Sequence, residues 1–161
     1  MIVSTTLTGS NADIIGDALA SIAPQVDRCI VIDTGARDDT LEVARRVAGD
    51  KLFVRDFPWR NDFAASRNFA LQAATQLGAR WAITVDTDER MHFADGVLLK
   101  KELLKCKAKV VLITAADGSY AKERIFRLPT RLAGKGPTHE AVDGKPEGGD
   151  ATLAGIHLMD S

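Results

Sequence analysis

Short apolar runs alternate with amphipathic segments along most of this 161-residue chain. Runs of this kind are typical of strands buried in a sheet, and those expected here span residues 2–7, 29–32, 51–54, 81–85 and 110–113. Between them, apolar side chains recur at helical spacing, which predicts helices over residues 14–22, 40–48, 64–77 and 97–107. Residues 11–13 and Asp39 or Thr40 supply the expected caps of the first two helices. The alternation favours βαβ units, so we expect an α/β protein with a mostly parallel, Rossmann-like sheet flanked by helices.

Length and charge restrict the classes of protein further. A domain of ~150 residues buries roughly two thirds of its unfolded surface, and no linker or repeat is visible, so a single domain over residues 1–161 is expected. The net charge of -1 argues against a nucleic-acid partner. The apolar runs are too short to span a membrane, and no signal peptide is visible, so a cytoplasmic location is expected. Cys29 and Cys106 lack the spacing of a metal site and are interpreted as reduced thiols.

Two acidic loops follow predicted strands. The first spans residues 33–39, and the second is Asp86-Thr87-Asp88. Open parallel sheets bind ligands at the carboxyl ends of their strands. Two carboxylates one residue apart can direct oxygens at one divalent cation that also binds substrate phosphates. The pattern therefore indicates a nucleotide or sugar-nucleotide site, against the equally weighted alternative of a solvated acidic turn.

Four sequence blocks carry a family resemblance, and they read VIDTGARDDT, DFPWRNDFAASRNFAL, WAITVDTDER, and RIFR with THEAV. Together they resemble the family 2 glycosyltransferases of GT-A fold, particularly the bacterial branch that includes lipopolysaccharide-core and peptide-modifying members. The resemblance covers about residues 1–142. Asn11-Ala12 departs from the Asn-Glu that usually opens the family's first helix. Family members normally continue beyond residue 161, which implies a compact transferase, a shortened chain, or acceptor elements supplied by a partner chain.

The resemblance implies a donor site built from the two acidic loops. Asp33 would lie near the nucleotide base or ribose with Thr8 as its neighbour, although a turn or helix-cap role is the alternative for Asp33. Arg67 would help to hold the nucleotide. Asp86 would face the ribose and the metal ion, and Asp88 would bind the metal ion, Mn²⁺ or Mg²⁺.

The resemblance also assigns three residues beyond the donor loops. His157 matches a late histidine that completes metal coordination, and a structural role is its alternative. His139 and Glu140 fall on the acceptor side, where a carboxylate can deprotonate an acceptor hydroxyl. Glu140 is thus the expected base, with His139 beside it.

Other charged residues have weaker implications. Glu89 would support the metal ligands from behind. Arg124, Arg127 and Arg131 would neutralise a diphosphate, or would be ordinary solvated side chains of an edge strand. A lysine cluster is expected to be a solvated helix face, and its members are Lys100, Lys101, Lys105, Lys107 and Lys109.

These observations predict a metal-dependent glycosyltransferase that moves a sugar from a nucleotide-diphosphate donor, a UDP-sugar, to a hydroxyl acceptor. The acceptor would be a saccharide, a lipid-linked molecule or a peptide, and the question of a homo-oligomer stays open. Residues 1–90 would form the nucleotide-binding half and residues 91–161 the acceptor-side half. A non-catalytic sugar-nucleotide binding domain is one alternative. A nucleotidyltransferase is another, but the loop at residues 8–11 lacks the basic residue that such an enzyme needs.

Overall fold

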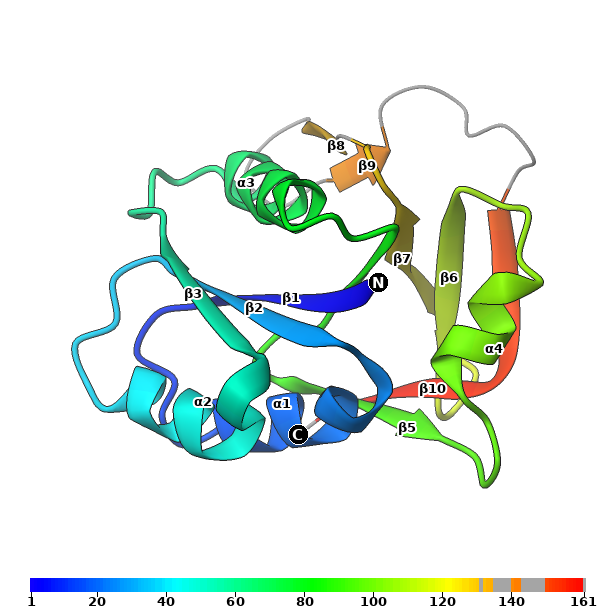
Figure 1. Ribbon diagram of the computed structural model, residues 1–161, viewed down its shortest axis with the longest axis horizontal. Helices are drawn as coiled ribbons and strands as arrows, with labels where there is room; N and C mark the ends of the chain where they lie inside the picture. Colours follow the sequence, from blue (N-terminus) through cyan, green and yellow to red (C-terminus); the bar gives the residue numbers. More distant parts are fainter. Residues whose placement is uncertain (131, 135–139, 143–149, 161) are drawn as a thin grey trace.

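The structure is a computed structural model that describes residues 1–130, 132–134, 140–142 and 150–160. An eight-stranded sheet has the order β3-β2-β1-β4-β7-β6-β10-β5 (Figure 1). Its strands are β1 (Ile2–Thr8), β2 (Arg28–Asp33), β3 (Leu52–Asp56), β4 (Trp81–Thr84), β5 (Glu89–Phe93), β6 (Val110–Ala115), β7 (Ala121–Arg127) and β10 (Asp150–Asp160). The helices are α1 (Ile15–Ile22), α2 (Thr40–Ala48), α3 (Phe63–Gln76) and α4 (Leu99–Leu104), with single 3-10 turns at Ala23–Gln25 and Gly49–Lys51. Two short strands, β8 (Leu132–Gly134) and β9 (Glu140–Val142), form a separate pair.

Parallel pairing in the first half confirms the α/β expectation. β1 pairs in parallel with both β2 and β4, and β2 pairs in parallel with β3. The carboxyl ends of these strands therefore meet at one edge of the sheet. Beyond β4 the sheet is mixed, because β7 is antiparallel to β4 and β6 is antiparallel to β7. β10 starts parallel to β6 and continues antiparallel to β5, so it links the far end of the sheet to β5.

Apolar side chains cover both faces of the parallel strands. α1 and α2 pack on one face and α3 on the other (Figure 1). The buried stripe of α1 is the one that the spacing predicts, and it consists of Ile15, Ala18, Leu19 and Ile22. α3 is rich in alanine on its buried side, which lets it lie close to the strands that lead into the acidic loops.

The structure corrects several expectations about element boundaries. No strand was predicted at residues 89–93, but the structure forms β5 there, and Glu89 and Met91 alternate as buried residues along it. α4 is shorter than the predicted helix over residues 97–107. The capping prediction for α1 was wrong, since its N-cap is Ile14 and no side chain caps it. The Asn11 carboxamide oxygen instead accepts hydrogen bonds from the Gly9 N–H and the Thr8 hydroxyl.

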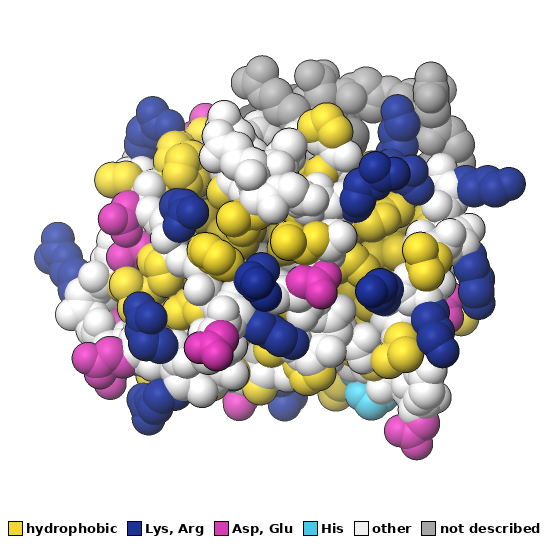
Figure 2. All heavy atoms as spheres, in the orientation of Figure 1, with side chains coloured by type: hydrophobic (Ala, Val, Ile, Leu, Met, Phe, Trp, Pro, Cys, Tyr) yellow, Lys and Arg dark blue, Asp and Glu magenta, His cyan; other side chains and the backbone are white. Residues whose placement is uncertain are grey.

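The lysines of the predicted cluster are exposed, as expected, but the single helix face was wrong, because α4 ends at Leu104 and only Lys100 and Lys101 lie on it. Figure 2 shows Lys and Arg side chains scattered over one face, with apolar and acidic groups between them. No helix in the described part of the chain has the length and apolar character needed to cross a membrane.

Candidate functional site

Hydrogen bonds join the loops at the carboxyl ends of β1, β2 and β3. Thr8 and Asp33 are direct neighbours at the ends of β1 and β2. The Thr34 N–H and hydroxyl both donate to the Thr8 carbonyl, at 2.9 and 3.0 Å. The Phe57 N–H donates to the Asp33 carbonyl at 2.9 Å. The sheet edge where the family resemblance puts the nucleotide is therefore held by backbone contacts between three loops.

Asp33 and Thr8 both support this edge internally. One carboxylate oxygen of Asp33 accepts from the N–H groups of Gly35 and Ala36, at 2.9 and 2.7 Å. This is the turn role considered as the alternative for Asp33. Thr8 is buried, and its hydroxyl lies 3.0 Å from the Asn11 carboxamide oxygen. The two residues lie together as predicted, and both shape the loop conformation.

Two arginines hold Asp86, which follows β4. Arg67 of α3 donates to Asp86 Oδ1 at 2.8 Å, and Arg124 of β7 donates to Asp86 Oδ2 at 3.2 Å. Burial acts to raise the pKa of the Asp86 carboxyl, but the charges and hydrogen bonds of the two arginines lower its pKa below the ordinary value. Asp86 is therefore ionised at neutral pH, with its charge balanced by groups from two other elements.

Glu89 lies behind Asp86 in a buried position. Its Oε1 accepts the Asp86 N–H at 3.1 Å, and its Oε2 accepts from Arg124 at 2.9 Å. Lys122 lies 3.5 Å from the same oxygen. The resemblance predicted a supporting role for Glu89, and this geometry is consistent with that role. Arg124 was expected to face a diphosphate or solvent, but it is 7% exposed and engaged with two carboxylates.

Asp88 differs from Asp86 in its exposure and in its contacts. It is exposed on the turn between β4 and β5, and no hydrogen bond or ion pair is found between its carboxylate and another described residue. Its oxygens are thus accessible to a cation. Mg²⁺ and Mn²⁺ commonly use one or two protein carboxylates together with substrate phosphates and water, and a single accessible carboxylate fits that pattern.

The structure does not bring His157 to the two aspartates. His157 lies on β10 opposite His92 of β5, three residues from Glu89 along that strand, or about 10 Å. Among the described residues, no three His, Cys, Asp or Glu side chains gather to hold a metal ion. The His157 Nδ1 atom is buried with no hydrogen-bond partner among the same residues. Asp86, Asp88 and His157 are therefore not a preformed set of three ligands.

Glu140, the predicted base, lies in the small β8–β9 pair. Glu140 is the first residue of β9, and its backbone pairs with Gly134 of β8. β8 contacts α3, the helix that carries Arg67. His139 and Arg131 lie outside the described residues.

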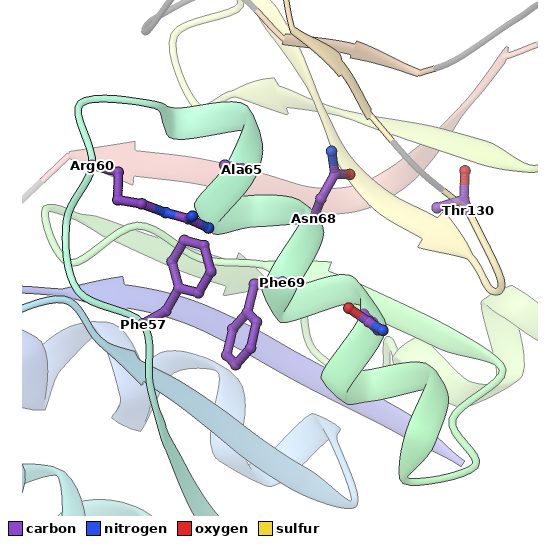
Figure 3. A pocket seen from close by; sticks show the side chains of 7 residues that line it. Phe57, Arg60, Ala65, Asn68, Phe69 and Thr130 are labelled. Carbon is purple, nitrogen blue, oxygen red and sulfur yellow. The ribbon is translucent and has the colours of Figure 1, made fainter.

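A pocket of about 460 Å³ lies along α3 (Figure 3). Its α3 residues recur at helical spacing, Ala65, Asn68, Phe69 and Gln72, so they form one stripe that excludes Arg67. Arg60 lies over the Phe57 ring at 4.5 Å, and Phe57 stacks on Phe69 with ring centroids 4.6 Å apart. No sequence pattern predicted this stack of Arg60, Phe57 and Phe69. Next to this stack, Trp59 and Phe63 make an edge-to-face contact with ring centroids 4.9 Å apart.

The pairing between Glu89 and Arg124 was also not predicted from the sequence. The two residues are 35 positions apart and lie on β5 and β7, which are not adjacent in the sheet. An arginine directly before the apolar residues Ile125 and Phe126 is the one local signal, because a buried arginine needs an acidic partner.

Comparison with known proteins agrees with the fold. The chain is 35% identical over 138 residues to a TPR repeat-containing protein of Synechococcus elongatus, a match that covers 82% of this chain and 33% of that protein. S. aureus TarS 1-349 is similar in structure, with a TM-score of 0.61 at 18% identity over 78% of this chain and 46% of that chain. The mannosyltransferase PcManGT from Pyrobaculum calidifontis has a TM-score of 0.60 at 17% identity, covering 78% and 44% of the two chains.

This chain spans about a third of the length of its Synechococcus relative and less than half of both solved structures. Residues 2–95 match the sequence model of Glycosyl transferase family 2. That segment is more than half of the chain, and it contains β1 to β5 with both acidic loops. The chain therefore belongs to glycosyl transferase family 2 and has the GT-A fold.

Proposed function

We propose that this chain binds a nucleotide-diphosphate sugar, a UDP-sugar, and a divalent cation, and transfers the sugar to a hydroxyl acceptor. The observation that carries the proposal is the difference in contacts and exposure between two neighbouring carboxylates after β4. Asp86 is held by Arg67 and Arg124, while Asp88 is exposed beside it. A rigid, charge-balanced aspartate next to an accessible one suits a site that must orient a nucleoside and bind a metal diphosphate.

Proteins of the same fold motivate the choice of donor. TarS has been solved with UDP, in a structure to which this chain has a TM-score of 0.56 at 21% identity. PcManGT has been solved with GDP-Man and Mn²⁺. Both cases support a nucleotide-sugar donor for this chain, and the acidic loops at the same sheet edge supply its expected contacts. The bacterial branch with lipopolysaccharide-core and peptide acceptors is part of this proposal.

Each residue of the site has a distinct proposed task. The loops of Thr8 and Asp33 contact the nucleoside, and Asp86 with Arg67 orients the ribose and nucleotide. Asp88 is the cation ligand, and His157, which pairs with His92 and Thr114 away from both aspartates, has no part in the proposed coordination. A bound Mn²⁺ or Mg²⁺ would neutralise the diphosphate of the leaving nucleotide.

Glu140 and His139 are the proposed residues of the acceptor side. Glu140 would accept the proton of the attacking hydroxyl, which is a standard task for a carboxylate within hydrogen-bond reach. The acceptor is proposed to be a saccharide, a lipid-linked molecule or a peptide. A cytoplasmic location is proposed with it.

The experiment that tests the proposal is calorimetric titration of the chain with UDP, GDP and UMP, each with Mn²⁺, with Mg²⁺ or with chelator. We expect UDP to bind with either metal ion and to lose most of its affinity in chelator. Thermal unfolding offers a second measurement, because a ligand at 100 times its Kd adds about 2.7 kcal/mol to the free energy of unfolding. Absence of binding by every nucleoside diphosphate would refute the proposal, and equal affinity in chelator would remove the metal from it.

A further inference from the structure

The turn that joins β4 to β5 is closed by reciprocal hydrogen bonds. The Glu89 N–H donates to the Asp86 carbonyl at 3.0 Å, and the Asp86 N–H donates to Glu89 Oε1 at 3.1 Å. Asp88 lies within this turn. The position of Asp88 therefore depends on contacts that Glu89 makes with both the N–H and the C=O of Asp86.

A single arginine ties the same turn to β7. Arg124 Nη2 lies 2.9 Å from Glu89 Oε2 and 3.2 Å from Asp86 Oδ2, so one nitrogen bridges the two carboxylates. The side chains of Glu89 and Arg124 are only 3% and 9% exposed. Two carboxylates this close repel each other, and Arg124 offsets that repulsion at the point where they meet.

Stability alone does not account for such a pair. A buried ion pair is often no more stabilising than apolar side chains of similar volume, because both charges lose their hydration. Breaking the pair by removing one partner is costly, since the other charge stays buried. We therefore expect the main effect of this buried pair to be on the position of neighbouring groups. Those groups are Asp86 and the turn that contains Asp88.

We propose that Glu89 and Arg124 are positioning residues that hold Asp86 in one rotamer and fix the turn that presents Asp88. The inference rests on the proposed function for its ligand. Neither residue needs to touch the donor, because both act through Asp86. Buried neighbours that hold a functional carboxylate within about 0.5 Å of its binding position preorganise the site. Ligand binding then does not have to offset the free-energy cost of ordering the loop.

Two variants test the proposal, and a third serves as the matched control. Glu89→Gln keeps the shape of the side chain and removes its charge, and Arg124→Lys keeps the charge and removes the bridging geometry. Arg127 was expected to face a diphosphate or solvent, but it pairs with Trp81 at the start of β4, at the far end of that strand from Asp86. It lies over the Trp81 ring at 4.7 Å and donates to the Cys106 carbonyl at 2.9 Å, so Arg127→Met is the control on the same strand as Arg124. All three variants alter the polar contacts of a buried or half-buried side chain.

The first measurement is the affinity for UDP with Mn²⁺ by calorimetry. We expect Glu89→Gln to weaken UDP at least tenfold, Arg124→Lys to weaken it less, and Arg127→Met to stay within twofold of the unaltered chain. Equal affinity in the unaltered chain and both test variants would overturn the proposal. An equal loss in Arg127→Met would also overturn it, because the effect would then follow general destabilisation.

The second measurement needs no ligand. Amide hydrogen exchange at Asp86 and Glu89 reports the turn directly, and we expect it to speed up at least tenfold in Glu89→Gln while amides of β2 keep their rates. Unchanged exchange at both positions would overturn the proposal. If the unaltered chain fails to bind any nucleoside diphosphate, the proposed function fails, and the exchange data still decide whether Glu89 holds the turn.

Discussion

The guanidinium of Arg67 lies 2.8 Å from the carboxylate of Asp86, and this contact joins α3 to the end of β4. The two residues are 19 positions apart and come from two different blocks of the family resemblance. Their contact means that Arg67 affects a nucleotide through Asp86 as well as through any contact of its own. A change at Arg67 is therefore also a change in the electrostatics of Asp86.

Arg67→Ala is expected to weaken UDP and a UDP-sugar by similar factors, of about tenfold or more. The reason is that the guanidinium of Arg67 is proposed to contact the nucleotide and contacts the Asp86 carboxylate that orients it. Neither contact involves the sugar. Calorimetry with both ligands in Mn²⁺ provides the measurement. Arg45→Ala is the matched control, because Arg45 is exposed on α2, and a loss confined to the UDP-sugar would contradict this interpretation.

Asp88→Asn is expected to remove most of the metal dependence of donor binding. The substitution replaces an exposed carboxylate by a neutral group and leaves the buried contacts of the turn in place, so thermal stability should change little. Titration of UDP against Mn²⁺ concentration measures the effect, with Asp17→Asn on α1 as a control of equal charge change. An unaltered metal dependence in Asp88→Asn would exclude Asp88 as the cation ligand.

Glu140→Gln is expected to reduce sugar transfer while donor affinity stays near that of the unaltered protein. Loss of a general base typically costs 10²- to 10⁴-fold in rate. The rate is to be measured with this chain and saccharide, lipid-linked and peptide acceptors, and donor affinity by calorimetry with metal ion. Full transfer by the variant would rule out Glu140 as the base, and loss of donor and metal binding would move it to the donor site, leaving Asp143 as the next candidate base.

Gly155→Ala is expected to destabilise β10 by about 1–3 kcal/mol, because Gly155 has φ +82° and an added Cβ would lie 2.9 Å from Val97 Cγ2. The Gly155 carbonyl also accepts the Ala94 N–H at 2.8 Å, so the backbone has little room to shift. Chemical denaturation measures the loss. Val97→Ala should restore part of it in the double variant, and Gly9→Ala, which meets no atom within 4 Å, should change stability little.

Asp38→Asn is expected to destabilise the chain at neutral pH and to have less effect in acid. The hydrogen bond from the Thr40 hydroxyl is the main cause that lowers the pKa of Asp38 below its ordinary value. A lowered pKa in the folded state stabilises the protein above the unfolded value of about 3.9, and this contribution is lost as pH falls through the lower folded value. The denaturation midpoints of the two proteins should therefore converge as the pH falls below the unfolded value. A constant difference from pH 7 to pH 2.5 would contradict the linkage.

Local patterns in the sequence determined the architecture of the first half. The apolar run at residues 29–32 and the helical stripe from Ile15 to Ile22 each bury one continuous surface, so their spacing alone predicts a strand and a helix. The alternation of such elements then predicts parallel strands with their polar loops at one edge. The placement of Thr8, Asp33 and Asp86 at that edge follows from the same logic, because each residue ends a strand or follows one directly.

Only the tertiary structure decided which charges meet. Arg67 and Arg124 come to Asp86 from α3 and β7, and Arg124 also meets Glu89 of β5. Long-range pairing of this kind has no periodicity along the chain. The same limit applies to β5 and to His157, whose position depends on β10 crossing from β6 to β5. Short-range propensity reports which face of an element is apolar, whereas the partner of a buried charge is chosen by the packing of separate elements against each other.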